Sequence, residues 1–203
     1  MGRPREHDDR TARALLDAAE RTVERDGVAG LSLRGVAGDA GTTTRAVYSL
    51  FGSKDGLIAA LGARAFELLR EGLDELPVTS DPQHDLVEAA LMFRRFALGH
   101  PILFSLGIQR ALGEPEHWRA FLPVAMSTLD VLESRFERLA DDGLLGERAT
   151  RDAAWEFHAL CEGLASVELR GLPPGVDFER LWRDGIYALV VGLATARTAG
   201  ARP

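Results

Sequence analysis

The chain has 203 residues, and its hydrophobic fraction of 46% is that of an ordinary globular protein. Its single cysteine excludes an internal disulfide and indicates a reducing compartment. The longest apolar run is too short to cross a bilayer and the N-terminus has no apolar signal segment, so we expect a cytoplasmic protein without a membrane anchor.

The net charge of −7 by itself argues against nucleic-acid binding, but the charges are unevenly distributed. Residues 1–56 hold nine of the 24 Lys and Arg residues and nine of the 31 Asp and Glu residues, so the acidic excess lies entirely beyond residue 56. Between residues 30 and 54, Arg34, Arg45 and Lys54 face one acidic residue, Asp39. This pattern indicates a locally basic surface on an acidic body.

The first predicted element is a helix over residues 11–26, with an apolar stripe that includes Leu15 and Val23 and an end at Gly27. Residues 1–9 are polar, and we expect them to be disordered. Two short helices follow, over about 33–40 and 44–50. Gly41 separates them because glycine adopts the left-handed conformation at little cost. Ser32 and threonines 42–44 supply N-cap hydroxyls.

Two short helices around a tight turn form a helix-turn-helix, whose second helix can enter the DNA major groove. Ser53 predicts the start of a longer helix that ends near residue 76, before Pro77. Asp81 and Pro82 start a helix over 82–98. Further helices are predicted over 102–112, 123–142, 148–170 and 178–198, with a helical turn over 116–122. No segment has the pattern of a strand, so the fold is predicted to be all-α, with about nine helices.

At these residues the chain resembles the tetracycline-repressor-like (TetR) family of transcriptional regulators. The resemblance rests on Leu31-Ser-Leu-Arg-Gly-Val-Ala37, Ala40-Gly41, Ala46-Val-Tyr48, Phe51 and Ser53-Lys-Asp55-Gly-Leu57. It implies a three-helix DNA-binding domain over residues 10–70, with its helix-turn-helix at about 32–51. Farther along, Trp155, Glu168-Leu-Arg-Gly171 and the helix from Ile186 to Leu193 resemble a WHG-type ligand-binding and dimerisation domain, placed at 77–200.

The resemblance implies a homodimeric repressor that binds a palindromic double-stranded DNA operator and that a small, largely apolar ligand releases. The two helices over about 148–170 and 178–198 of each subunit would form the dimer interface, and no cofactor or metal is expected. A DNA-binding factor controlled by a partner protein is the alternative. An enzyme is disfavoured because the chain has no G-x-S-x-G, H-E-x-x-H, P-loop or G-x-G-x-x-G motif.

Several side chains of the helix-turn-helix and its surroundings are candidates for DNA contact. Arg45 can read guanine through two hydrogen bonds, although a phosphate contact is nearly as well supported. Tyr48 can bond phosphate or pack against the first helix of the motif, and Thr43 can cap a helix as well as touch DNA. Lys54, the only lysine, lies at a helix start where phosphate binds well. The full candidate set is Arg34, Thr43, Thr44, Arg45, Tyr48, Ser49 and Lys54.

The C-terminal body contains many bulky apolar residues, most of which must form its core. A subset is predicted to line a ligand pocket, because such pockets are mostly apolar with few polar groups. These are Met92, Phe93, Phe96, Phe104, Ile108, Phe121, Met126, Trp155 and His158. His158 and Glu162 stand four residues apart, and a partly exposed pair is favoured over a ligand-binding one. Cys161 is expected to be a buried, inert thiol, with metal binding or redox sensing as the alternatives.

Overall fold

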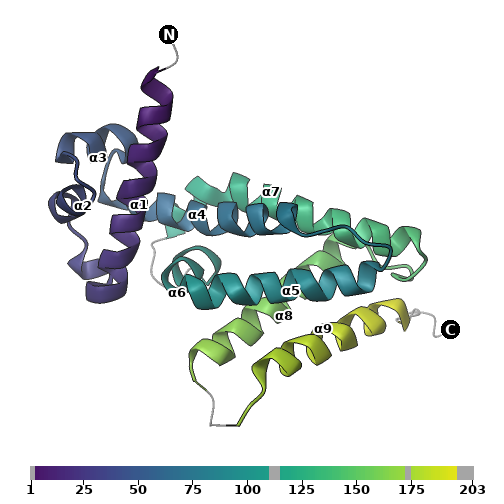
Figure 1. Cartoon of the computed structure of the whole chain (residues 1–203). Helices are drawn as coiled ribbons and strands as arrows, with labels where there is room; N and C mark the ends of the chain where they lie inside the picture. The colour runs from purple at the N-terminus through teal and green to yellow at the C-terminus, as the bar shows by residue number, and fades with distance from the viewer. Residues whose placement is uncertain (1–2, 110–114, 172–174, 196–203) are drawn as a thin grey trace. The chain divides into compact units, whose positions relative to one another are not determined.

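The computed structural model describes residues 3–109, 115–171 and 175–195. Over these ranges the chain forms nine α-helices and one π-helical segment and has no strand, which confirms the all-α prediction (Figure 1). The elements are α1 (Arg3–Gly30), α2 (Leu33–Asp39), α3 (Thr44–Phe51), α4 (Lys54–Glu75), α5 (Pro82–Gly99), α6 (Pro101–Leu103), η1 (Phe104–Ile108), α7 (Pro115–Asp141), α8 (Thr150–Leu169) and α9 (Phe178–Thr195).

The helices form two compact units, and α4 contributes to both. The first unit comprises residues 1–66 and 102–124, and the second comprises 67–101 and 125–203. In the first unit, η1 approaches α4 closely: a Cβ added at Gly107 would lie 2.7 Å from the Cβ of Ala65 and 2.8 Å from the carbonyl oxygen of Gly62. The functional domains at 10–70 and 77–200 remain a prediction.

In the first unit, α1 packs against α2 and α3 around a small core (Figure 1). Leu15, Val36, Val47 and Leu57, one from each of the first four helices, are fully buried. Burying such side chains is worth about 1.5–3 kcal/mol each. This core fixes the orientation of α3, the helix predicted to enter the major groove.

The ends of α1 differ from the prediction. The helix begins at Arg3, so the expected disorder over residues 1–9 is wrong for residues 3–9. Pro4 lies in the first turn, where its missing N–H costs nothing. At the other end, Gly27 (φ 70°, ψ 174°) breaks the helical geometry as predicted, and a further helical stretch continues to Gly30 beyond the kink.

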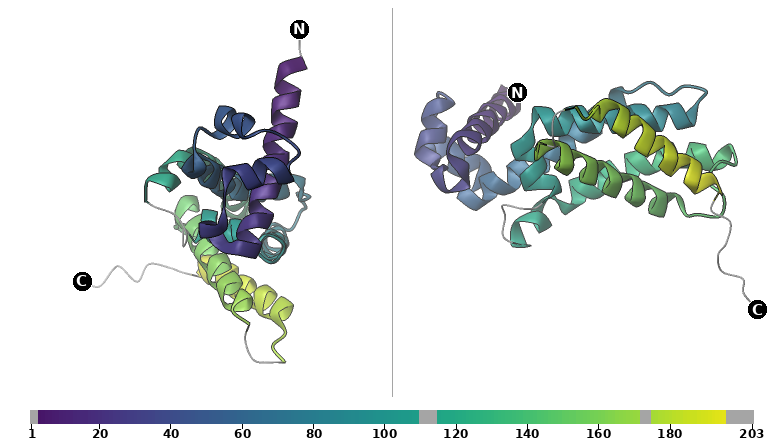
Figure 2. Two further views of the ribbon diagram at one scale, coloured as in Figure 1. Left: turned by 90° about the vertical axis from the view of Figure 1, so that its left-hand side faces the viewer. Right: turned by 90° about the horizontal axis from the view of Figure 1, so that it is seen from below.

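In the second unit, α5 packs against α8 and α9, and α8 and α9 lie side by side (Figure 2). Trp182 of α9 is fully buried, and its indole Nε1 donates to Glu168 Oε2 at 2.9 Å. Glu168 also accepts two hydrogen bonds from Nε of Arg94 and one from Nη2. One carboxylate thus joins α5, α8 and α9.

Two helix predictions between residues 100 and 142 need correction. The predicted helix over 102–112 is a short α6 followed by the π-helical η1, and its last residues, 110–112, lie outside the described part of the chain. The predicted break at Pro123 is wrong because α7 runs through it. Pro123 is exposed while Phe121 and Ala125 beside it are buried, so water can satisfy the carbonyl that the proline leaves unpaired.

Within the described ranges, no helix combines the length and apolar character needed to cross a membrane.

Candidate nucleic-acid interface

The turn between α2 and α3 is built by glycine and backbone hydrogen bonds. Gly41 has φ 65°, a left-handed conformation that favours glycine. Its N–H donates to the carbonyl of Gly38 at 3.1 Å, and the N–H of Thr42 donates to the carbonyl of Ala37 at 2.8 Å. These two bonds form a Schellman motif, which ends α2 sharply and sets the direction in which α3 starts.

Side-chain caps fix the starts of α2 and α3. Ser32 Oγ accepts a hydrogen bond from the N–H of Gly35 at 3.1 Å, and Thr43 Oγ1 accepts one from the N–H of Ala46 at 3.3 Å. The capping role predicted for both residues is therefore confirmed. Each such cap contributes about 1 kcal/mol to stability. Because Thr43 is also exposed, capping does not prevent part of its hydroxyl from reaching DNA.

One face of α3 is buried and the opposite face is open to solvent. Val47 is fully buried in the first unit, whereas Arg45, Tyr48 and Ser49 are exposed. Tyr48 is 56% exposed, so burial against α2 does not explain why a tyrosine stands at this position. An exposed guanidinium, phenol and hydroxyl on one short helix are groups that hydrogen-bond base edges and phosphate oxygens.

The start of α4 follows directly after α3. Gly52 (φ 74°) ends α3, and the N–H of Gly56 donates to Ser53 Oγ at 3.0 Å. Lys54 is the first residue of α4 and is half-buried. The first N–H groups of a helix lack intrahelical partners and carry a partial positive charge, so they favour an anion next to Lys54.

Gly56 belongs to the Ser53–Leu57 motif, but sequence reasoning gave this glycine no role, whereas the structure does. A Cβ added at this position would lie only 1.9 Å from the carbonyl oxygen of Phe51. Any side chain here would push the end of α3 away from the start of α4. The sequence offered one signal for this role. Gly56 lies inside the first turn of a predicted helix, where glycine lowers stability by about 1 kcal/mol relative to alanine.

The seven candidate DNA contacts lie on adjoining elements of the first unit. Arg34 is exposed on α2, Thr43 precedes α3, and Thr44 is half-buried at its start. The other four lie on α3 or at the start of α4, as described above. The structure therefore presents all seven from the helix-turn-helix and the helix after it, while their individual roles stay predictions.

The predicted pocket residues divide between the two compact units. Phe104, Ile108 and Phe121 are buried in the first unit, where the ring of Phe121 stacks on Phe66 with centroids 5.8 Å apart. Phe121 also fills the space over Gly62, since a Cβ added there would lie 2.6 Å from its ring. These contacts are those of a packed interior.

In the second unit, ring contacts connect several of the other pocket candidates. Phe93 lies edge-on to His158 at 5.9 Å and is 6.3 Å from Phe96, and His158 lies edge-on to Trp155 at 5.8 Å. Met92 is buried and Met126 is half-buried. Phe93, Phe96, His158 and Trp155 thus form one aromatic cluster from α5 and α8. Whether these candidates line a pocket stays a prediction.

The geometry around Cys161 fits an inert thiol. Cys161 is fully buried, and burial raises its pKa well above the usual value, which keeps the reactive thiolate scarce. Nε2 of His158 lies 3.9 Å from Oε2 of Glu162, and both side chains are partly exposed. This matches the partly exposed pair that the four-residue spacing predicted.

Comparison with protein families gives a match in the region of these elements. The model of the bacterial regulatory proteins of the tetR family matches residues 15–61, from the middle of α1 to the first half of α4. This range contains all seven candidate DNA contacts.

Two curated relatives share sequence with the chain. An uncharacterized HTH-type transcriptional regulator of Mycobacterium tuberculosis is 24% identical over 189 residues, which cover 92% of this chain and 83% of that protein. The nicotine-responsive transcriptional repressor HdnoR of Paenarthrobacter nicotinovorans is 39% identical over 72 residues, 36% of each chain.

Solved structures share the fold over nearly the whole chain. A protein of unknown function from Rhodococcus sp. RHA1 has a TM-score of 0.79 and 25% identity, covering 91% of this chain and 95% of its own. AibR, solved in complex with isovaleryl coenzyme A and operator DNA, has a TM-score of 0.64 and 18% identity, covering 88% of this chain and 97% of its own. The similarity to AibR concerns the fold alone.

Proposed function

Because the chain belongs to the tetR family of bacterial regulatory proteins and is a DNA-binding transcriptional regulator, we propose that it is a homodimeric repressor that a small molecule releases from a palindromic operator. The observation that supports DNA binding through α3 is the exposed face of this helix. Arg45, Tyr48 and Ser49 lie there, over a buried Val47 that fixes the helix in its unit. The proposed repressor acts in the cytoplasm and has no enzymatic activity.

The proposal gives each candidate side chain a role, supported by its exposure and its place on the helices. Arg45 and Ser49 are assigned to base edges, and Tyr48 is assigned to a phosphate. Lys54 binds a second phosphate together with the first N–H groups of α4. Arg34, Thr43 and Thr44 support the backbone contacts. The DNA-binding domain is residues 10–70, and the ligand-binding and dimerisation domain is residues 77–200.

The dimer is proposed to form through α8 and α9. These helices expose large apolar side chains in the single chain: Trp155 is 43% exposed, Tyr187 57% and Leu181 40%. Ala188 and Gly192, also exposed on α9, are small enough to let a second helix approach closely. Apolar surface of this kind is typical of a protein–protein interface. Two helices from each subunit would form a four-helix interface about a two-fold axis.

Release by a small molecule is proposed by analogy with the relatives. HdnoR is named as nicotine-responsive, and AibR was solved with both a coenzyme A ester and operator DNA. For release, the ligand must bind the form with low DNA affinity more tightly than the form with high affinity. Control by a partner protein is not favoured, because the relative with a stated signal answers to a small molecule.

Two measurements test the proposal. Light scattering should give a mass of about 44 kDa, twice the 22.1 kDa of one chain. Selection of bound sequences from a random DNA pool should return two inverted half-sites whose centres lie about 10–10.5 base pairs apart, or a multiple of that spacing. A monomer at micromolar concentration, or a selected pool without inverted repeats, would refute the homodimeric operator model.

A further inference from the structure

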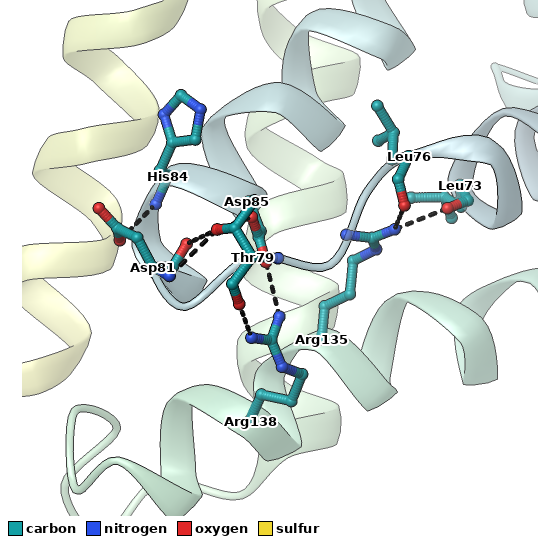
Figure 3. A network of polar contacts seen from close by, with 8 residues as sticks. All are labelled: Leu73, Leu76, Thr79, Asp81, His84, Asp85, Arg135 and Arg138. Carbon is teal, nitrogen blue, oxygen red and sulfur yellow. Dashed lines mark hydrogen bonds and ion pairs between the residues drawn. The ribbon is translucent and has the colours of Figure 1, made fainter.

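Arg135 of α7 is a charged residue in the interior of the second unit. It is 6% exposed, and Nη2 of its guanidinium donates to the carbonyl oxygen of Leu73 at 2.6 Å and to that of Leu76 at 3.3 Å (Figure 3). Both acceptors lie at or directly after the last turn of α4, where the carbonyls of a helix lack intrahelical partners. One of the two terminal nitrogens of this side chain therefore has its acceptors within the protein.

The other terminal nitrogen of Arg135 does not. Nη1 is buried and makes no hydrogen bond within the described part of the chain. In Figure 3 it points away from the carbonyls of Leu73 and Leu76. Nη1 carries two N–H groups, and burying such donors without an acceptor is destabilising. We therefore looked for the kind of acceptor that this position suits.

The charges around Arg135 do not balance. Arg138, one turn farther along α7, is paired with Asp85: its Nη1 donates to Oδ2 at 2.6 Å, and Asp85 is almost fully buried. Two arginines and one buried carboxylate leave a formal charge of +1, of which the negative end of the α4 dipole offsets a part. Asp74 also attracts Arg135, but it lies at the surface in an ion pair with Arg70.

An anionic oxygen suits Nη1 better than a water molecule does. A buried water would accept a hydrogen bond from Nη1 but would leave the excess charge in place. An anionic oxygen would accept a charge-assisted hydrogen bond and would also neutralise that charge. The charge is costly as it stands, because burial lowers the pKa of Arg135.

The neighbours of Arg135 determine what kind of anion fits. Leu132 and Leu139 stand three residues before and four residues after it on α7, and both are buried. A Cβ added at Gly72 would lie 2.6 Å from Sδ of Met92, so this flexible side chain, one of the predicted pocket residues, lies beside the last turns of α4. An inorganic ion would lose its hydration here for few hydrogen bonds, whereas an organic acid gains by burying its apolar body.

We propose that Arg135 binds the anionic group of a small organic acid, a carboxylate attached to an apolar body, through the N–H groups of Nη1. The inference rests on the proposed release by a small molecule, and it names the class of that molecule as a monocarboxylic acid instead of a neutral compound. The predicted pocket residues include no arginine or lysine, so Arg135 supplies a charge that they lack.

The test measures the binding of two acids and their neutral amides to the full chain. Octanoate is compared with octanamide, and benzoate with benzamide, by titration calorimetry and by the shift in Tm at equal concentration. Each pair has the same apolar body, so a difference within a pair reports the anionic group. Arg135→Met removes the guanidinium and keeps a long apolar side chain. Arg70→Met is the matched control, because it removes the same charge from the exposed pair with Asp74.

We expect at least one acid to bind the native protein about ten- to hundredfold more tightly than its amide, the usual gain from a hydrogen bond to a charged group. This preference should disappear in Arg135→Met and persist in Arg70→Met. Acids that bind no better than their amides, or a preference that survives in Arg135→Met, would overturn the inference. If Arg135→Met does not fold, Arg135→Lys takes its place: a lower preference supports the inference, and an unchanged one counts against Arg135.

Operator affinity, measured with and without each compound, separates this inference from the proposed function. An acid that binds through Arg135 and lowers operator affinity supports both. A neutral compound that lowers operator affinity, while no acid is preferred, leaves the proposed function standing and overturns the acid class. An acid that binds through Arg135 without changing operator affinity supports the binding site and contradicts its part in release.

Discussion

The carboxylate that joins α5, α8 and α9 offers a strong test of what holds the second unit together. Glu168 accepts hydrogen bonds from Nη2 of Arg94 at 2.7 Å and from the indole of Trp182 at 2.9 Å, and its side chain is only 9% exposed. Glu168→Ala removes the carboxylate and leaves the Arg94 guanidinium and the Trp182 indole N–H without this acceptor. We predict a loss of about 3–5 kcal/mol in the free energy of unfolding, the usual cost of breaking a buried ion pair.

The structure places the effect near the lower end of this range. The Arg94 side chain is 22% exposed, so water can solvate part of the guanidinium after the carboxylate is removed. Trp182 is fully buried, and its unpaired indole N–H costs about 1–3 kcal/mol by itself. A loss of about 3 kcal/mol corresponds to a fall in Tm of about 6–12 °C for a chain of this length. Glu168→Gln should cost less, because the amide oxygen can still accept from Trp182.

The measurement is urea-induced unfolding followed by circular dichroism at one protein concentration, since the stability of a dimer depends on concentration. Glu179→Ala is the control: it removes an exposed ion pair with Arg183 on α9, worth about 0–1 kcal/mol. Replacing Arg94 and Glu168 together by leucine should restore part of the loss, because no unpaired charge remains. A Glu168→Ala variant within about 1 kcal/mol of the native protein would refute the reasoning.

Three further predictions concern DNA binding and pH. Lys54→Ala should weaken binding on all sequences alike and lower the slope of log affinity against log salt by about one; an unchanged slope would exclude a phosphate contact. Arg45→Ala should relax preference at one operator position by about 1–3 kcal/mol, whereas uniform weakening would assign it to the backbone. Burial alone would raise the pKa of Asp85, but hydrogen bonds from Thr79 and Arg138 outweigh it and lower the pKa below its usual 3.8. The stability that the ionised Asp85 carboxylate contributes is therefore present above that pH and is lost as pH falls through the lowered pKa. Asp85→Asn should lower the free energy of unfolding more at pH 7 than near pH 3. Equal losses at the two pH values would contradict this.

The helix-turn-helix could be predicted from sequence because its determinants are local. Ser32, Thr43 and Ser53 each cap a helix by accepting a hydrogen bond from the backbone N–H three residues ahead. Gly41 and Gly52 end helices through their own left-handed conformations. Interactions that close over three or four residues depend little on the rest of the fold, so the residue types and their spacing suffice to locate them.

The corrected elements are those where packing outweighed local preference. Proline ordinarily ends or kinks a helix, but burial of Phe121 and Ala125 on either side of Pro123 keeps α7 continuous. The close approach of η1 to α4 likewise depends on Gly107, where an added Cβ would lie 2.8 Å from the carbonyl oxygen of Gly62. Glycine pairs at a helix crossing leave no periodic signal in the sequence.

The sequence by itself determined the all-α class, the helix boundaries set by caps and glycines, and the family that the DNA-binding residues indicate. Only the tertiary structure decided which distant groups the arginines contact. Arg94 meets Glu168 across 74 positions, and Arg135 reaches Leu73 across 62. Such pairs depend on how whole helices pack, and the sequence alone does not distinguish these arginines from the exposed ones. The helix-turn-helix was therefore evident from local chemistry, whereas these long-range side-chain contacts were not.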